Sequence, residues 1–350
     1  MNIADASDPA ALARAARILK RGGLVAFPTE TVYGLGADAT NPRAALKIFA
    51  LKKRPAFDPL IVHALDLRQA MALWKPLPAR LDADVRRLAA AFWPGPLTIV
   101  LPKAPGVPDV VTAGLDTVAV RVPSHPCARR LLARLGRPIA APSANLFGRT
   151  SPTTARMVRE DLGGGPGLIL DGGRTAVGVE STVIEAGKSG FVLLRPGGVP
   201  LERLRKIVRV RPRSRSGRLS SPGLLKSHYA PRTPLTLMDR PRAAWTRRFG
   251  PLARNARVGL LTFGGGAASG GVFAASVSLS RRGDLSEAAS ELFQAMRKLD
   301  RMSLDLIVAE RVPERGLGLA VMDRLRRASA GTPGPAAVFR NLEKKRRKGK

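Results

Sequence analysis

The sequence predicts an α/β protein with a larger domain over residues 1–208 and a smaller one over residues 233–330. Three observations predict this class. Short apolar segments alternate with helical segments, the 350 residues exceed the length of one typical domain, and the composition changes abruptly at residue 209. Such alternation is typical of a mixed, largely buried, twisted sheet that is covered by helices.

In the first domain, capping and stop signals mark where helices begin and end. Asp8-Pro9 precedes a helical segment, and Gly22-Gly23 ends that segment before an apolar strand. Asn41-Pro42 begins the next helix in the same way. The predicted strands are 24–27, 60–62, 97–101, 118–122, 139–141, 168–170, 182–184 and 191–194, and the predicted helices are 10–21, 42–51, one opened by Asp66, 80–92, 126–135 and 153–162.

The second domain follows an Arg-, Ser- and Pro-rich segment, 209–232, which lacks apolar periodicity and is predicted to be a linker. Beyond it we expect strands at 235–238, 258–263, 272–279 and 306–310 and a helix that begins at Asp284. Its apolar face is formed by Leu285, Ala288, Ala289, Leu292, Phe293, Met296 and Leu299. Residues 331–350 are predicted to be a basic tail, and its last residues, 342–350, are predicted to be disordered.

The composition narrows the class of protein. The formal charge is +33, with 59 Lys and Arg against 26 Asp and Glu, which makes RNA or nucleotides natural partners, although solvated Arg-rich faces would explain the excess equally well. The single cysteine, Cys127, fits a reducing cytosol, and three scattered histidines do not suggest a metal site. We expect a cytoplasmic location and no membrane association, because neither an export signal nor a long apolar run is present.

Candidate functional residues lie where apolar strands end, which is where open α/β sheets usually bind ligands. Four such segments stand out, and each also has an ordinary structural explanation: a turn at 28–36, dipole-complementing cations at 52–54, a capped helix start at Ser151 and polar strand ends at 180–197. Arg121 belongs with them because a charge within a predicted strand requires a partner.

The order of these segments resembles the YrdC/Sua5 family. The matching stretches are 28–36 (PTETVYGLG), 52–55 (KKRP), 118–123 (VAVRVP), 141–145 (APSAN), 180–183 (ESTV), 195–197 (RPG), 221–223 (SPG), 228–231 (HYAP) and 316–325 (GLGLAVMDRL). The last three resemble the longer, two-domain Sua5 type. This resemblance implies a YrdC-like α/β domain followed by a smaller Rossmann-like Sua5 domain.

The resemblance also implies an activity, namely a nucleotidyltransferase that makes threonylcarbamoyl-adenylate from ATP, L-threonine and bicarbonate. Its implied cofactor is Mg²⁺ carried with ATP, with no structural metal, and its product would pass to threonylcarbamoyl-transferase proteins that modify tRNA. Matching the motifs places Thr31, His63, Arg121 and Ser181 at the threonine. On the nucleotide side it places Lys52, Arg54, Thr117, Ser143, Asn145, Ser151, Arg195 and Tyr229. Lys52 and Arg54 are the implied catalytic residues, because fixed cations stabilise charge that develops on phosphate.

Several alternatives and departures accompany this interpretation. Asp58, Phe147 and Leu224–Ser227 differ from the family pattern, and Asp58 brings an acid close to phosphates. A non-catalytic RNA-binding module would also explain the charge, whereas a carbamoyl-transfer maturation factor would need additional cysteines. Residues 218–231 are predicted to be a lid over the first domain's cleft or, alternatively, a passive tether.

Overall fold

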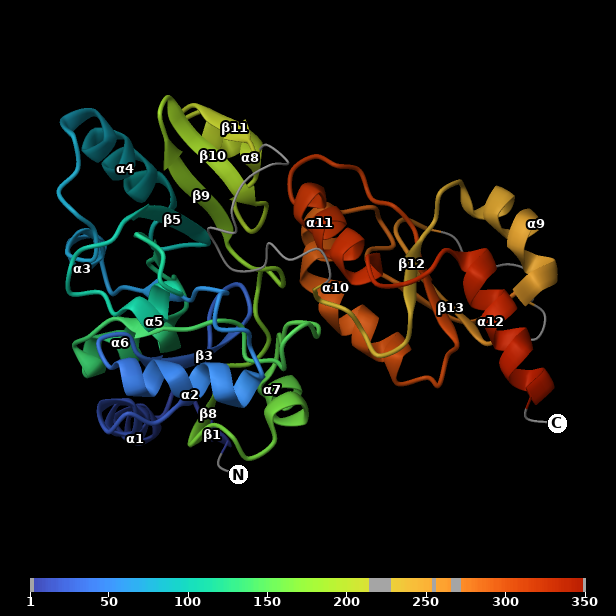
Figure 1. Cartoon of the computed structure of the whole chain (residues 1–350), viewed down its shortest axis with the longest axis horizontal. Coiled ribbons are helices and arrows are strands. Elements are labelled where there is room, and N and C mark those ends of the chain that lie inside the picture. Colours follow the sequence, from blue (N-terminus) through green and yellow to red (C-terminus); the bar gives the residue numbers. More distant parts are fainter. Residues whose placement is uncertain (1–2, 214–227, 254–255, 266–271, 349–350) are drawn as a thin grey trace. The chain divides into compact units, whose positions relative to one another are not determined.

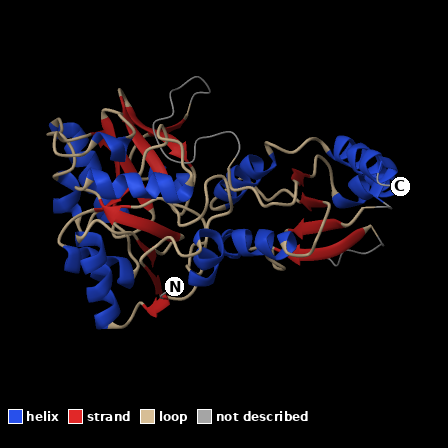
Figure 2. Ribbon diagram, turned by 60° about the horizontal axis from the view of Figure 1, so that its bottom comes forward, coloured by secondary structure: helices blue, strands red, loops and turns tan. Residues whose placement is uncertain are grey.

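The computed structural model describes residues 3–213, 228–253, 256–265 and 272–348, and these residues form two compact units. The first unit comprises residues 1–147 and 151–224 of the chain, and the second comprises 148–150 and 225–350. Each unit has strands with helices packed against them, as Figure 1 and Figure 2 show. The α/β class predicted from the alternation of elements is confirmed.

The described part of the first unit contains an 11-stranded mixed sheet. Along the sheet the strands are β1 (Ile3–Asp5), β8 (Leu168–Asp171), β2 (Val25–Pro28), β3 (Tyr33–Asp38), β7 (Ile139–Ala140), β4 (Ile61–His63), β6 (Thr117–Arg121), β5 (Leu97–Pro102), β9 (Thr182–Gly187), β10 (Gly190–Arg195) and β11 (Val210–Pro212). Pairs such as β4 with β6 are parallel, whereas β9 and β10 form an antiparallel hairpin. The mixed sheet predicted from the sequence is therefore present.

The helices of the first unit cover this sheet (Figure 1). They are α1 (Pro9–Lys20), α2 (Pro42–Lys52), α3 (Leu67–Met71), α4 (Ala79–Phe92), α5 (Asp109–Thr112), α6 (Pro126–Leu135), α7 (Ala155–Leu162) and α8 (Leu201–Arg205). Helices α1 and α6 share a core with β2, β7 and β8, in which Leu12, Leu19 and Leu131 are buried. Asp8 and Asn41 cap α1 and α2 as predicted, since their side chains accept hydrogen bonds from the first-turn N–H groups.

The second unit has a four-stranded sheet whose strands are all parallel, in the order β12 (Leu235–Leu237), β15 (Leu306–Ala309), β13 (Val258–Thr262) and β14 (Phe273–Ser278). Helices α9 (Arg242–Ala253), α10 (Leu285–Asp300), α11 (Gly318–Ser329) and α12 (Pro335–Lys348) complete it, with α10 and α11 on one face of the sheet and α9 and α12 on the other (Figure 1). This arrangement matches the Rossmann-like expectation.

Two sequence-based boundaries differ from the structure. Strand β11 lies within the segment predicted as linker, because Val210 is buried and pairs with Phe191 on β10. The predicted basic tail contains α12, and because this helix extends to Lys348, the disorder predicted from residue 342 onward was wrong up to that residue. Val338 and Phe339 anchor this helix, since both are buried in a core with Trp245 and Phe249 of α9.

The segment Gly148–Thr150 groups with the second unit although its sequence neighbours belong to the first. The backbone N–H of Ala230 donates to Gly148 O at 2.8 Å, and Arg297 Nη2 donates to Thr150 O at 2.8 Å. Predicted linker residues 214–227, including the SPG stretch, lie outside the described residues.

Candidate active site

The candidate site begins with residues on three neighbouring strands of the first unit. His63 ends β4 and is the ladder partner of Arg121, which ends β6. Thr98 on β5 is the ladder partner of Arg121 on the other side. Because directly paired residues present their side chains to the same face of a sheet, the fold sets an imidazole, a guanidinium and a hydroxyl beside one another.

Arg121 is buried and its charge is balanced by a protein carboxylate. Glu30, in the turn between β2 and β3, places Oε1 2.6 Å from Arg121 Nη2. Burial alone would raise the pKa of Glu30, but the charge and hydrogen bonding of Arg121 hold it below its ordinary value. Arg121 Nε donates to Gly95 O at 3.2 Å. The partner that the sequence required for Arg121 is therefore Glu30, a residue the sequence analysis did not single out.

A hydroxyl chain continues from this ion pair. Arg121 Nη1 donates to Thr31 Oγ1 at 2.9 Å, and Thr31 Oγ1 lies 2.8 Å from Thr29 Oγ1. Since Thr29 Oγ1 donates to Val32 O at 2.7 Å, Thr31 is the donor in the pair of hydroxyls. Thr31, predicted at the threonine side, is thus bonded to Arg121.

His63 is almost fully buried beside Arg121. Burial, followed by the charge of Arg121, lowers the pKa of His63 from 6.5 to about 3, so its ring is neutral at physiological pH. Among the described residues no hydrogen-bond partner of its Nδ1 is found. A neutral imidazole with a buried ring nitrogen can form a hydrogen bond with a bound molecule.

Ser181 and Arg195 form the next group, at the open end of the β9–β10 hairpin. Arg195 Nη2 donates to Ser181 O at 3.0 Å and to Ser181 Oγ at 3.2 Å. Ser181 Oγ is also 2.8 Å from Thr98 Oγ1, which connects it to the strand that carries the partner of Arg121. Two buried guanidinium groups therefore flank a set of buried hydroxyls.

The predicted nucleotide side centres on Lys52 and Arg54 at the end of α2. Lys52 Nζ donates to the backbone oxygens of Ser143, at 2.5 Å, and Asn145. Burial, followed by the charge of Arg54, lowers the pKa of Lys52 well below its ordinary value. The ammonium group is therefore held at the loop that contains Ser143 and Asn145.

Arg54 is the second cation of this side. Its Nη2 lies 2.9 Å from Asp58 Oδ2 and donates to Pro59 O at 2.8 Å. Burial raises the pKa of Asp58, while the charges of Arg54, Lys52 and Arg195 oppose that rise. The departure at Asp58 from the family pattern thus supplies a buried counter-charge to Arg54.

Ser151 has a different role from the helix cap that the sequence suggested. Helix α7 begins at Ala155, and its cap is Thr154, whose side chain accepts from Met157 N. Ser151 is fully buried and donates through Oγ to a carboxylate oxygen of Glu180. The capping interpretation of Ser151 was therefore wrong, because the helix begins four residues later and Thr154 caps it.

Charge interactions connect the two sides of the site. Burial raises the pKa of Asp58, and the charge of Arg195 opposes this rise. Burial lowers the pKa of Lys52, and the charge of Glu180, which precedes Ser181, opposes this fall. The fold therefore brings together ten of the predicted residues in one polar region of the first unit. They are Thr31, Lys52, Arg54, His63, Arg121, Ser143, Asn145, Ser151, Ser181 and Arg195, joined by Glu30 and Glu180, which were not among the predicted site residues.

Thr117 is not part of this region. It begins β6, whereas Arg121 ends the same strand, so the two are four residue steps, or about 13 Å, apart. The contacts that the structure gives Thr117 are those of the ladder with Pro102 on β5.

Tyr229 belongs to the second unit. Its ring is 1% exposed and packs 5.7 Å from the ring of Phe293 on α10, with the guanidinium of Arg324 5.0 Å above it. In this arrangement Tyr229 contributes to the core of the second unit. A role for its side chain at ATP stays a prediction.

Within the described ranges, no group of three or more His, Cys, Asp and Glu side chains is arranged to hold a metal ion. None of the helices that the structure describes combines the length and apolarity needed to cross a bilayer. Burial raises the pKa of the Cys127 thiol to about 12, so this cysteine is not a reactive thiolate.

Comparison with known proteins assigns both halves of the chain. Residues 17–197 match the Sua5/YciO/YrdC family model, whose description reads "Telomere recombination", and residues 199–330 match "Threonylcarbamoyl-AMP synthase, C-terminal domain". The threonylcarbamoyl-AMP synthase of Pyrococcus abyssi is 44% identical over 326 residues, which cover 90% of this chain and 93% of that protein. The protein of the same name from Bacillus subtilis is 42% identical over 335 residues, or 91% and 93% of the two chains.

A solved structure supports the same relationship. The crystal structure of P. abyssi Sua5 complexed with L-threonine aligns with a TM-score of 0.81 at 44% identity and covers 91% of this chain and 94% of that one. At this level of similarity the chain is an enzyme of the same class as the threonylcarbamoyl-AMP synthases that it matches. With both domains matched, the chain belongs to the Sua5/YciO/YrdC family, in the two-domain form that carries the Sua5 C-terminal domain.

Proposed function

We propose that the chain is a threonylcarbamoyl-AMP synthase, a nucleotidyltransferase that joins L-threonine, bicarbonate and ATP and releases pyrophosphate. The observation that carries this proposal is the set of four buried cations, Lys52, Arg54, Arg121 and Arg195, in one polar region of the first unit. Buried cations are costly unless they serve a fold or an anion, and ATP and threonine both bring anionic groups. The relatives that match most of the chain carry the same name.

The threonine side of the site would use the Arg121–Glu30 pair. A zwitterionic amino acid offers one carboxylate and one ammonium group, and this ion pair offers the complementary charges 2.6 Å apart. We propose that Arg121 shifts its Nη2 from Glu30 to the threonine carboxylate, because its planar fork matches a carboxylate, and that Glu30 then faces the amine. Thr31, Ser181 and His63 would contact the rest of the molecule.

The nucleotide side would use Lys52, Arg54 and Arg195. Lys52 and Arg54 both donate to backbone oxygens, which fixes their positions before a ligand arrives. Because burial lowers the pKa of Lys52, a bound polyphosphate would raise that pKa back toward its ordinary value and favour the charged ammonium form. ATP is proposed to enter with Mg²⁺ on its phosphates, since Asp58 and Glu180 are already bonded to Arg54 and Ser151.

The reaction that this arrangement would support has two steps. The threonine amine adds carbon dioxide, which derives from bicarbonate, and loses a proton to give a carbamate. A carbamate oxygen then attacks the α-phosphorus of ATP, and the bond to the bridging oxygen breaks as pyrophosphate leaves. The protein contributes position and fixed positive charge, which stabilises the phosphate oxygens as charge develops. The product is proposed to pass to a threonylcarbamoyl-transferase for tRNA modification in the cytoplasm.

Pyrophosphate release tests this function. The full chain is incubated with MgATP, and threonine, bicarbonate or both are withheld in turn. We expect rapid release only when both are present, with Arg54→Ala reducing turnover by roughly 10²–10³ because it removes a fixed cation at the phosphates. Release that is independent of threonine would reject the proposal and would favour an unrelated ATP-hydrolysing activity.

A further inference from the structure

Glu30 carries a buried carboxylate whose two oxygens have different partners. Its Oε1 lies 2.6 Å from Arg121 Nη2, and among the described residues no hydrogen-bond partner of this oxygen beyond that ion pair is found. Its Oε2 accepts from the backbone N–H of Ser124 at 3.1 Å. A ligand that draws Arg121 away therefore frees Oε1, while Oε2 keeps its hydrogen bond.

The backbone around Glu30 is held by other contacts. Val177 N donates to Glu30 O at 2.8 Å, which ties the turn to the chain that follows β8. Within the turn, Thr29 Oγ1 accepts from the N–H groups of Thr31 and Val32 at 3.2 and 3.3 Å. The fold therefore keeps the carboxylate in position whether or not its counter-ion is paired with it.

The donors of Arg121 divide between the fold and Glu30. Nε donates to Gly95 O at 3.2 Å and Nη1 donates to Thr31 Oγ1 at 2.9 Å, whereas Nη2 is the donor that faces Glu30. A substrate carboxylate can take over Nη2 while the other two nitrogens keep the guanidinium in place. This exchange belongs to the proposed function, so the role inferred for Glu30 rests on that function.

The exchange makes Glu30 a stronger base. Burial raises the pKa of this carboxyl, and the charge and hydrogen bonding of Arg121 more than offset that rise. Once Nη2 has turned to the substrate, burial remains and the offset weakens, so the pKa of Glu30 rises. A buried carboxylate beside an ammonium group also favours transfer of the proton between them, because two neutral partners need less solvation than two ions.

Two imidazoles interact with the charge of Glu30, and both are weak bases. Burial, followed by the charge of Arg121, lowers the pKa of His63 to about 3. Burial also lowers the pKa of His125, whose Nδ1 accepts from Cys127 N at 3.2 Å and caps α6. Neither ring is therefore a base that competes with Glu30 near neutral pH.

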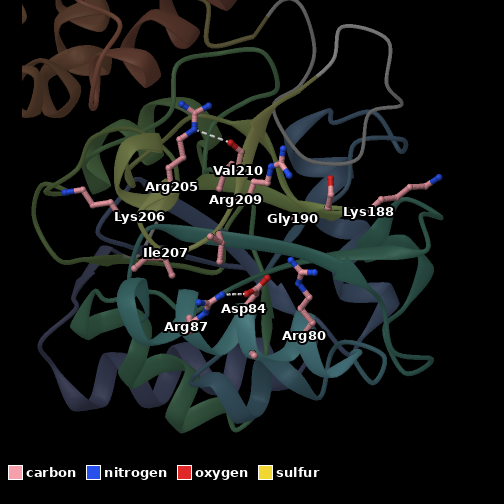
Figure 3. A pocket seen from close by; sticks show the side chains of 13 residues that line it. Arg80, Asp84, Arg87, Lys188, Gly190, Arg205, Lys206, Ile207, Arg209 and Val210 are labelled. Carbon is pink, nitrogen blue, oxygen red and sulfur yellow. Dashed lines mark hydrogen bonds and ion pairs between the residues drawn. The ribbon is translucent and has the colours of Figure 1, made fainter.

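Other carboxylates of the first unit lie in different surroundings. Asp58 and Glu180 interact with the cations of the nucleotide side. Asp84 is bonded to Arg87, and both line a hollow of about 790 Å³ that shares no residue with the candidate site (Figure 3). Of these four carboxylates, Glu30 is the one on the threonine side.

Carbamate formation requires a base at the threonine nitrogen. Near neutral pH the amino group is an ammonium ion, which has no lone pair with which to attack carbon. After one proton has left, the amine bonds to the carbon of carbon dioxide, which bicarbonate yields together with hydroxide. The second proton from nitrogen joins that hydroxide as water, so the ammonium proton is the one that the protein must accept.

We propose that Glu30 is the general base that takes the ammonium proton of threonine onto Oε1 and so creates the amine that forms the carbamate. The carboxylate of the substrate draws Arg121 from Glu30, and the substrate thereby activates its own amine. When the product leaves, Arg121 returns to Glu30 and the proton passes to water. An amino compound without a carboxylate leaves the Arg121–Glu30 pair intact and is not activated.

The experiment measures the initial rate of pyrophosphate release by the full chain from MgATP, threonine and bicarbonate between about pH 7 and pH 9. Glu30→Gln keeps the shape of the side chain and cannot accept the proton, whereas Glu30→Asp keeps a carboxylate. The matched control is Asp38→Asn, which removes another buried carboxylate, at the end of β3, that is paired with Arg137 at 2.9 Å. Each variant is compared with the wild type at the same pH, so that changes in the bicarbonate supply cancel.

We expect Glu30→Gln to lower kcat by about 10²–10³ at neutral pH, with a smaller change in the KM for threonine. Because free threonine supplies its own amine as pH rises, the rate of this variant relative to the wild type should increase by up to about tenfold per pH unit. Glu30→Asp should lose less activity and, like Asp38→Asn, should show the wild-type pH profile.

A wild-type kcat in Glu30→Gln with a raised KM for threonine would overturn the proposal, because Glu30 would then only bind the ammonium group. A loss of kcat that stays constant with pH would overturn it too, because the role of Glu30 would then be structural. Both results leave the proposed function intact, which fails instead if the wild-type chain releases no pyrophosphate in response to threonine. If Glu30→Gln does not fold, as judged by lost ATP binding, Glu30→Gln/Arg121→Gln replaces it, and the same increase with pH decides.

Discussion

Arg121 shows how a single buried charge organises the candidate site. The sequence indicates that a cation within a strand needs a partner, and the structure supplies Glu30 as the counter-ion, with Thr31 and Gly95 accepting its remaining hydrogen bonds. An ion pair of this kind holds both side chains in fixed positions. Removing one partner leaves the other charged and buried, which destabilises a protein by about 3–5 kcal/mol.

Arg121 can therefore be tested with single and paired variants. Arg121→Ala should lower the free energy of unfolding by about 3–5 kcal/mol, because Glu30 loses its counter-charge. The double variant Glu30→Gln/Arg121→Gln should have a higher free energy of unfolding than Arg121→Ala, because neither buried charge remains. It should nevertheless raise the threonine concentration needed for activity far more than the ATP concentration. Denaturant unfolding and substrate titrations measure the two effects. If the paired variant needed both substrates at the wild-type concentrations, Arg121 would not bind threonine.

His63 predicts how stability changes with pH. Its pKa is about 3 in the folded chain and 6.5 as the ordinary value, so between these pH values the unfolded chain binds a proton that the folded chain does not. The contribution of this group to stability is therefore lost as pH falls below 6.5, by about 2 kcal/mol between pH 7 and pH 5. Denaturant unfolding of the wild type and His63→Gln at both pH values measures it. Identical losses in the two proteins would show that His63 is not the group responsible.

Residue-level prediction from the sequence was most specific where a motif carried the information. Lys52, Arg54, Arg121 and Arg195 are all buried in the predicted region because each lies at the end of a helix or strand that the sequence also predicts. The sequence could not give the pairing of Ser151 with Glu180 or of Arg121 with Glu30, since those contacts join residues 29 and 91 positions apart. Thr117, which the motif match places at the nucleotide, begins the strand that Arg121 ends, and its role there stays a prediction.

At the scale of elements, regular apolar periodicity was the most informative signal. Helix α10 begins after Asp284 as predicted, and its buried residues include Ala288, Leu292, Phe293 and Met296. Helix α9 was missed because Gly250 and Pro251 lie inside it and look like a turn in the sequence. Strands β1 and β11 were missed because three residues are too few to show alternation.

Helix α12 provides a test at this scale. Ending the chain after Gly334 removes Val338 and Phe339, whose burial contributes about 1.5–3 kcal/mol each, so the second unit should unfold at a lower denaturant concentration. Ending it after Arg340 keeps both side chains and should leave the midpoint nearly unchanged. If the two truncations unfolded alike, the packing of α12 on α9 would contribute nothing measurable.

At the scale of the whole molecule, the open question is why two units are joined by a segment with a specific sequence. The hypothesis that 218–231 acts as a lid stays a prediction, because 214–227 lie outside the described residues. His228 and Tyr229, at the end of this segment, pack together with Phe293 in the second unit. A passive tether would not need such an attachment.

A fragment of residues 1–213, which keeps β11, tests the lid hypothesis. The fragment should bind ATP with the affinity of the full chain but yield little threonylcarbamoyl-adenylate, because the unstable intermediates would be exposed to water. Tyr229→Phe in the full chain is the matched control, since it keeps the ring that packs on Phe293. A fragment with full product yield would contradict the lid and support the tether.

The central claim is that one chain joins threonine, a carbon from bicarbonate and the adenylyl group of ATP. The most direct measurement is mass spectrometry of the nucleotide product after incubation with MgATP, L-threonine and ¹³C-bicarbonate. The account predicts an adenylate that contains threonine and carries the label, formed together with pyrophosphate. Two results would contradict it: a threonyl-adenylate without the label, or AMP with no threonine adduct in a reaction that is stopped before the product can decompose.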